Sequence, residues 1–146
     1  MTDDASVFRV AYVSRNIGEM DEAGLHELLR KSRHNNVRRG VTGALLFSPE
    51  CFAQVLEGPI AEVETLFERI QCDSRHSDVV ILMSERGVPR QFGEWAMAYA
   101  GDDDAQRVRF AAMSYGELAA GASAAAPILD ILRGAVGRAE PALPLT

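Results

Sequence analysis

The side chain amide of Gln54 is the first chemical group in this sequence that needs an explanation. Gln54 stands in the middle of Cys-Phe-Ala-Gln-Val-Leu-Glu-Gly, residues 51–58, a run of apolar and β-favouring residues that a Gly-Pro pair closes. The alternation of a strand places Gln54 on the same face as Phe52 and Leu56. Because burying an amide without partners costs about 1–3 kcal/mol, we expect Gln54 to be hydrogen-bonded to another group.

Three other polar side chains are expected to face the same layer. Tyr12 lies on an alternating strand that is a neighbour of the Gln54 strand in the predicted sheet. Ser32 and Asn36 continue the apolar stripe of a predicted helix. A tyrosine and a glutamine that satisfy each other in the core would account for Tyr12 and Gln54 alone. With Asn36 added, the polar groups form one end of an apolar slot between two helices, which is how planar cofactors are held.

The elements that position these groups follow the order β-α-β-β-α-β-β. They are predicted as strand Phe8–Ser14, helix Asp21 to about Asn35, strands Val41–Phe47 and Cys51–Gly58, helix Pro59 to about Asp73, and strands Asp78–Ser84 and Phe92–Ala100. This order is the ferredoxin-like α+β arrangement with one more strand, and it puts both helices on one face of the sheet. The strands are apolar on both sides, so the other face needs a cover.

The C-terminal residues can supply that cover. Asp102–Asp104 are expected to begin one helix, and Pro127–Val136 reads as a second, amphipathic helix. We therefore expect residues 1–100 to carry the slot and residues 101–146 to form a helical extension of the same globular unit.

Composition limits the classes of protein that fit. A length of 146 residues with 47% hydrophobic and 25% charged residues is typical of one globular domain. A net charge of −6 argues against a nucleic-acid surface. No apolar run approaches the ~20 residues that span a bilayer, and the polar first residues show no signal peptide. We therefore expect a cytoplasmic protein that contacts neither nucleic acid nor membrane.

No constellation of catalytic or metal-ligating residues stands out. A Gly-rich phosphate loop, zinc-ligand spacing and a nucleophile elbow are all missing from the sequence. The three histidines, His26, His34 and His76, are dispersed and are expected at the surface or in packing. Cys51 and Cys72 have no metal-ligand spacing and are expected to be reduced thiols in the core.

Five segments of the chain together resemble the BLUF domains, which are blue-light sensors with a bound flavin. They are Arg-Val-Ala-Tyr-Val-Ser (9–14), Asn-Asn with Gly-Val-Thr-Gly (35–36 and 40–43), Phe-Ala-Gln-Val-Leu-Glu-Gly (52–58), Asp-Ser-Arg-His-Ser (73–77) and Phe-Gly-Glu-Trp-Ala-Met (92–97). No single segment is decisive, but five in this order and spacing are specific. The resemblance covers about residues 7–100, and the fold of the family agrees with the element order above.

The resemblance implies a role for each matching position. Tyr12 and Gln54 would be the photoactive pair, and Asn36 would bind the polar edge of the flavin ring. Ser32 is added to the cofactor site by the helix stripe and not by the resemblance. Leu28 and Ile70 would sandwich the ring between the helices. The remaining positions are the link to the pyrimidine end of the ring (Asp73, Arg75 and His76), the signal relay on the fifth strand (Trp95 and Met97) and two weaker candidates for the ribityl-phosphate side (Lys31 and Arg69).

The implied protein is a blue-light photoreceptor that binds FAD, or FMN, within residues 1–100. A phenol is an electron donor whose proton can leave with its electron, and an amide offers an acceptor at one end and a donor at the other. Rotation or tautomerisation of Gln54 would therefore change the hydrogen bonds around the flavin. We expect no catalytic output from this chain, and signalling through the C-terminal helices or a partner protein, with homo-oligomerisation left open.

Two functions of other classes remain as alternatives. A small ferredoxin-like hydrolase of the acylphosphatase type would hold a phosphate with Arg and Asn, but no Arg-containing loop follows the first strand. A structural interaction module would bind no chromophore at all.

Overall fold

The structure, a computed structural model, describes residues 7–17, 21–48, 50–74, 76–91, 98–99, 115–118 and 127–130. Its elements are β1 (Val7–Asn16), α1 (Glu22–Arg39), β2 (Thr42–Phe47), β3 (Cys51–Gly58), α2 (Ile60–Gln71), β4 (His76–Val88), β5 (Ala98–Tyr99) and α4 (Tyr115–Leu118). Residues 127–130 are also helical. None of the described helices is both long enough and apolar enough to cross a bilayer.

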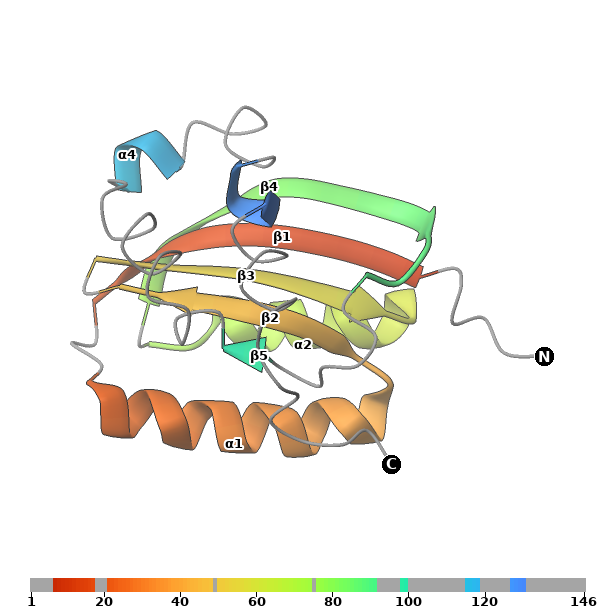
Figure 1. Cartoon of the computed structure of the whole chain (residues 1–146), viewed down its shortest axis with the longest axis horizontal. Coiled ribbons are helices and arrows are strands. Elements are labelled where there is room, and N and C mark those ends of the chain that lie inside the picture. Colours follow the sequence, from red (N-terminus) through yellow and green to blue (C-terminus); the bar gives the residue numbers. More distant parts are fainter. Residues whose placement is uncertain are drawn as a thin grey trace.

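The strands form one sheet in the order β4-β1-β3-β2-β5 (Figure 1). Strand β1 pairs antiparallel with both β3 and β4, β2 pairs antiparallel with β3, and β5 runs parallel to β2. This confirms the predicted α+β, ferredoxin-like arrangement. It also confirms that the Tyr12 strand and the Gln54 strand are direct neighbours.

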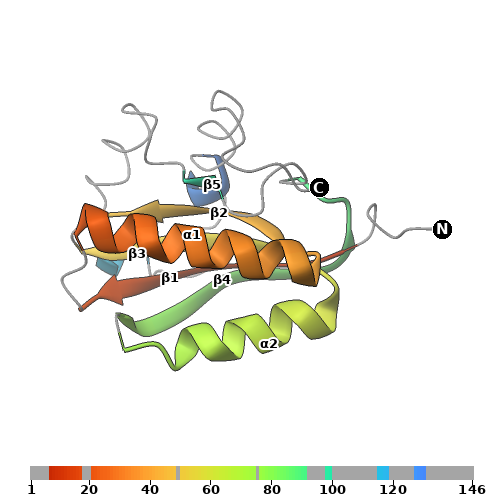
Figure 2. The same cartoon turned by 90° about the horizontal axis from the view of Figure 1, so that it is seen from below.

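One face of the sheet packs against α1 and α2. The apolar core between them consists of buried side chains from both helices, three strands and the residue before β2: Val10, Leu25, Leu29, Val41, Leu45, Phe52, Leu56 and Val63. Phe52 and Leu56 are therefore on the face of β3 that alternation predicted for Gln54. Figure 2 shows α2 on one side of the sheet and the helical residues 127–130 on the other.

The opposite face of the sheet is also buried, as the apolar strands required. Ala11, Val13 and Val55 are fully buried there, and Ile128 and Leu129 from the helical residues 127–130 are buried as well. These residues confirm part of the predicted helix Pro127–Val136. The rest of that helix and the helix expected from Asp102 lie outside the described residues.

Helix α1 is longer than predicted. Asp21 caps its first turn through a 2.8 Å hydrogen bond from the Gly24 amide to Oδ1, as expected. The helix continues past Asn35 to Arg39 because Gly40, at φ +71°, adopts the left-handed conformation that ends helices. Asn36 is therefore part of the last turn, where its orientation is fixed by the helix.

Strand β4 also extends beyond its predicted limits, Asp78–Ser84, at both ends. His76 and Ser77, expected in a link, pair with Asn16 and Arg15 of β1, and Val88 pairs with Val7. The strand follows β1 along its whole length, with register shifts that absorb the irregular spacing. Of the predicted fifth strand, Ala98 and Tyr99 are described and form β5; residues 92–97 and 100 lie outside the described part.

Candidate functional site

Tyr12 and Gln54 contact each other in the interior. They are register partners on β1 and β3, and the two residues are 3% and 8% exposed. The Tyr12 phenol donates a short hydrogen bond to Oε1 of Gln54. Sequence reasoning required a partner for the buried amide, and the structure shows that the phenol is one.

Burial keeps the proton on the Tyr12 phenol. The pKa of Tyr12 lies far above its ordinary value, first because burial disfavours the phenolate and second because the negative charge of Asp73 repels it. The ring is held in place by Phe67, whose centroid is 5.4 Å away at an interplanar angle of 56°. Tyr12 is thus a fixed, neutral hydrogen-bond donor directed at one atom of Gln54.

A cavity opens beside this pair, between the sheet and the two helices. Its volume is about 110 Å³, whereas one water needs only about 10–15 Å³ by the same kind of measure. The lining residues are Tyr12, Leu28, Ser32, Asn35, Asn36, Leu45, Phe52, Gln54, Leu66, Ile70, Asp73 and His76. Eight of the nine residues assigned to the site from sequence are therefore in one cavity; the ninth, Arg75, lies outside the described residues.

The cavity is lined by both apolar and polar side chains. Leu28 comes from α1 and Ile70 from α2, so aliphatic side chains reach the cavity from both helices. Asn36 is 1% exposed and brings an amide to it. Such a slot suits a planar molecule with an apolar ring face and a rim of hydrogen-bonding atoms, which is the chemistry of an isoalloxazine ring. The residues present thus fit a flavin.

His76 connects three elements at the edge of the cavity. Its Nε2 is in hydrogen-bond contact with the carbonyl oxygen of Ile70, which can only accept, so Nε2 carries a proton. Its Nδ1 is 2.7 Å from Oγ of Ser14, and in a neutral imidazole that nitrogen accepts from the serine. The ring also meets Phe52 edge-on at 6.0 Å. His76 thereby ties β1 and β4 to the end of α2.

Other predicted residues lie away from the cavity or outside the described part. Lys31 is exposed and is 3.9 Å from Glu27 on its own helix, and Arg69 is exposed in the last turn of α2. Neither lines the cavity. Trp95 and Met97, the residues of the expected relay, belong to the part that the structure does not describe.

Four lining residues had not been assigned from sequence: Asn35, Leu45, Phe52 and Leu66. Leu45 is the register partner of Gln54 on β2, and Phe52 precedes Gln54 by two positions on β3. A cross-strand and same-face rule around Gln54 would have found both. Asn35 also had a signal, because it follows Leu28 by seven residues and Ser32 by three and so lies on the same face of α1.

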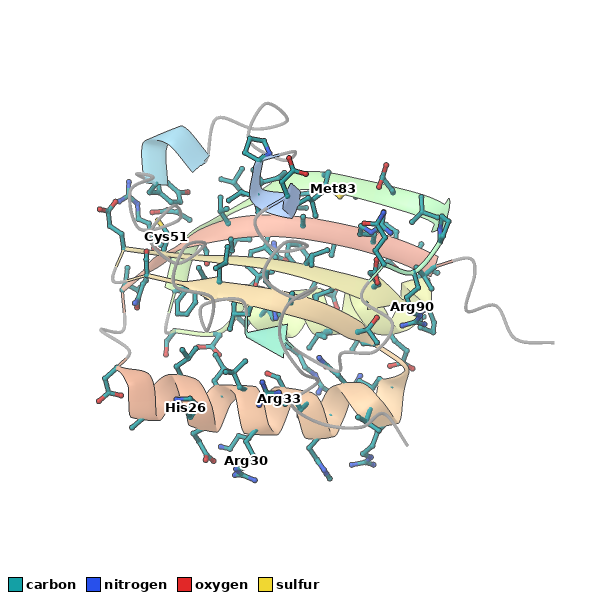
Figure 3. The ribbon with its side chains drawn as sticks, in the orientation of Figure 1. His26, Arg30, Arg33, Cys51, Met83 and Arg90 are labelled. Atoms are coloured by element: carbon teal, nitrogen blue, oxygen red, sulfur yellow. The ribbon has the colours of Figure 1, made fainter. Side chains whose placement is uncertain are left out.

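The cysteines and the other histidines are not part of the site. Cys51 is buried, but Cys72 is exposed, so the expectation of two core thiols was wrong for Cys72. Cys72 directly follows the last residue of α2, where the buried stripe of the helix has ended. His26 and His34 are exposed on α1, and Figure 3 labels His26 on that helix.

Comparison with known proteins identifies the family of this chain. The family model BLUF, described as sensors of blue light using FAD, matches residues 7–98. The photoactivated adenylate cyclase subunit beta of Euglena longa is 30% identical over 106 residues, which are 70% of this chain and 12% of that protein. The chain thus spans about an eighth of that relative.

Solved structures show the same fold. The dark state of BlrB, a BLUF protein, matches with a TM-score of 0.73 and 26% identity over 89% of this chain and 97% of that one. BlrP1 of Klebsiella pneumoniae, solved with FMN and cyclic diGMP, matches with a TM-score of 0.59 and 35% identity over 64% of this chain and 25% of that one. These matches favour the flavin sensor over the acylphosphatase-type hydrolase and the interaction module. The chain belongs to the BLUF family, the blue-light sensors that bind a flavin.

Proposed function

We propose that blue light is sensed here by a change in the hydrogen bonds of Tyr12 and Gln54, and that this change is passed to the C-terminal segments and to a partner protein. The observation that carries the proposal is the bond from the buried Tyr12 phenol to Oε1 of Gln54 beside the cavity. When bound, the flavin supplies a light-driven oxidant.

The chain's own residues then account for the rest of the proposal. The Tyr12 phenol holds its proton at Oη in the dark, so loss of an electron would make that proton strongly acidic. Oε1 of Gln54 is the acceptor next to it. Rotation or tautomerisation of the Gln54 amide would exchange the acceptor and donor ends that face the cavity. A donor newly directed at the flavin would shift its absorption slightly to the red.

The other residues of the cavity have proposed binding roles. Asn36 and Ser32 would hold the polar edge of the ring, Leu28 and Ile70 its two faces, and Asp73, Arg75 and His76 its pyrimidine end. FAD is the expected cofactor, and FMN an acceptable one. We further propose residues 1–100 as the flavin-binding unit, Trp95 and Met97 as relay residues, a cytoplasmic location, and no catalytic activity within this chain.

The test is a visible spectrum of the protein with bound flavin before and after blue light, followed through dark recovery. A reversible red shift is expected. Tyr12→Phe and Gln54→Leu should each abolish the shift while flavin stays bound. The matched controls, Tyr115→Phe and Gln71→Leu, change the same residue types away from the cavity and should keep it.

Two results would refute parts of this proposal. A protein that binds no added flavin would exclude the sensor function. A photocycle that persists in Tyr12→Phe or Gln54→Leu would exclude the roles assigned to those residues.

A further inference from the structure

A second polar cluster lies in the sheet, three residues along the strands from Tyr12 and Gln54. Arg9 and Thr42 are the register partners of Glu57 on either side, just as Tyr12 and Leu45 are those of Gln54. The two rows thus cross the same strands, β1, β3 and β2, about 10 Å apart. Three residues of a strand reverse the direction of the side chain, so this row is on the face opposite the cavity.

The centre of this cluster is a carboxylate with no access to solvent. Glu57 is 0% exposed and Arg9 3%, and Nε of Arg9 is 2.9 Å from Oε2 of Glu57. Thr42 donates to Oε1 of Glu57 at 3.4 Å. Replacing a buried ion pair of this kind with apolar residues is often neutral or stabilising, so stability alone does not explain it.

The cluster binds the chain that leaves β4. The backbone amide of Gln91 donates to both carboxylate oxygens of Glu57, at 3.0 and 2.9 Å. Arg9 donates to the carbonyl oxygen of Pro89 at 2.5 Å. Arg90 donates to Oγ1 of Thr42 at 2.8 Å and to the carbonyl oxygens of Gly40 and Glu57 at 3.1 and 3.4 Å. Figure 3 shows Arg90 at the end of the sheet opposite Cys51.

We propose that Glu57 is a positioning residue for the light response: its carboxylate fixes the β4–β5 connection at Gln91 to the strands that carry Tyr12 and Gln54. The fixed end is the last described residue before positions 92–97. A displacement of β3 at Gln54 would then move Glu57, and with it the start of the following segment. This inference rests on the proposed photoreceptor function.

Glu57 can fix the β4–β5 connection because several strong hydrogen bonds meet at this one residue of a rigid strand. A backbone amide held by a buried, charged acceptor forms a stronger bond than one held by a neutral acceptor. In addition, β3 is buried over its whole length. Segments that connect strands are usually more mobile than the strands themselves, but here Gln91 and Arg90 are both bonded to Glu57.

The test uses the full chain saturated with FAD and the variant Glu57→Gln, which keeps the shape of the side chain and removes its charge. Amide hydrogen exchange in the dark, measured by NMR, should become roughly tenfold faster at Gln91. Exchange at Val55, in the middle of β3, should not change. The matched control is Glu85→Gln, since Glu85 pairs with Arg9 at 3.0 Å but is 46% exposed and does not bind Gln91.

The second readout is the chain's single tryptophan, Trp95. Quenching of its fluorescence by acrylamide should differ between dark and light in the unmodified protein and in Glu85→Gln. In Glu57→Gln the two values should coincide, although the flavin still shows its red shift. If Glu57→Gln does not fold, Arg90→Gln, at a half-buried position, takes its place with the same two readouts.

The outcomes separate this inference from the proposed function. Unchanged exchange at Gln91 in Glu57→Gln would overturn it. The inference would also be overturned if acrylamide quenching of Trp95 did not differ between dark and light in the unmodified protein, or if it differed as much in Glu57→Gln. In either case a red shift that is still present would leave the proposed function standing. Absence of the red shift in the unmodified protein would refute the proposed function, and this inference with it.

Discussion

Replacing Tyr12 with Phe tests whether the buried phenol is protonated and stabilises the fold. The test compares how the free energy of unfolding of the two proteins depends on pH. At neutral pH the variant loses the bond to Gln54 and leaves its buried Oε1 without that donor. Such a loss costs about 1–3 kcal/mol. The packing of the ring on Phe67 is kept, because Phe has the same ring.

At high pH the sign of the difference should reverse. The pKa of Tyr12 is raised in the folded protein, whereas an unfolded tyrosine titrates near 10. The contribution of this phenol to stability is therefore complete below about pH 10. Above about pH 10 the unfolded chain loses the proton that the folded chain keeps. The free energy of unfolding of the wild-type protein therefore falls by about 1.4 kcal/mol per pH unit because of this group. The variant has no such loss.

The two stabilities should therefore cross between about pH 11 and 12, where one to two pH units of loss offset the 1–3 kcal/mol advantage. Urea unfolding of both proteins from pH 8 to 12, at equal flavin saturation, measures the difference. Cys51, whose pKa burial and Glu50 raise to about 11, affects both proteins alike and cancels. Parallel stability curves from pH 9 to 12 would refute the buried, protonated state of Tyr12.

Three further predictions concern other parts of the chain. Gly43→Ala should destabilise the protein by about 3 kcal/mol or more in urea unfolding, because the new Cβ would lie 2.0 Å from the carbonyl oxygen of Val55; a change below about 1 kcal/mol would contradict this contact. Iodoacetamide at pH 8 should label exposed Cys72 rapidly and Cys51 only after denaturation, since Cys51 is buried and its pKa is raised; equal native labelling would contradict that burial. Asn36→Ala should weaken FMN and FAD binding alike, by roughly tenfold, since the proposed contact of its buried amide is with the ring that both flavins share; a titration that shows weaker binding of FAD only would contradict this proposed contact.

The sequence alone determined which groups needed partners and which elements carry them. The alternation of β3 put Gln54 among Phe52 and Leu56, and the stripe of α1 ended in Ser32 and Asn36. These patterns are local, because a strand repeats every two residues and a helix every 3.6. The element order and the neighbouring positions of β1 and β3 followed from the same patterns and the known arrangement of such folds.

Tertiary structure decided what those patterns could not. That Tyr12 donates to Gln54 depends on the register of β1 against β3, and that Asn36 stays within α1 depends on the left-handed conformation of Gly40. Strand β4 runs from His76 to Val88 because a partner strand lies beside it, although its own sequence suggested a shorter element. Nothing in the sequence indicated that Arg9 and Glu57 form a pair. Alternation puts each of them on the same face of its strand as apolar residues, and only the assembled sheet brings Nε of Arg9 within 2.9 Å of Oε2 of Glu57. Side chain periodicity is a property of one segment, whereas register, close approach and ion pairing are properties of two.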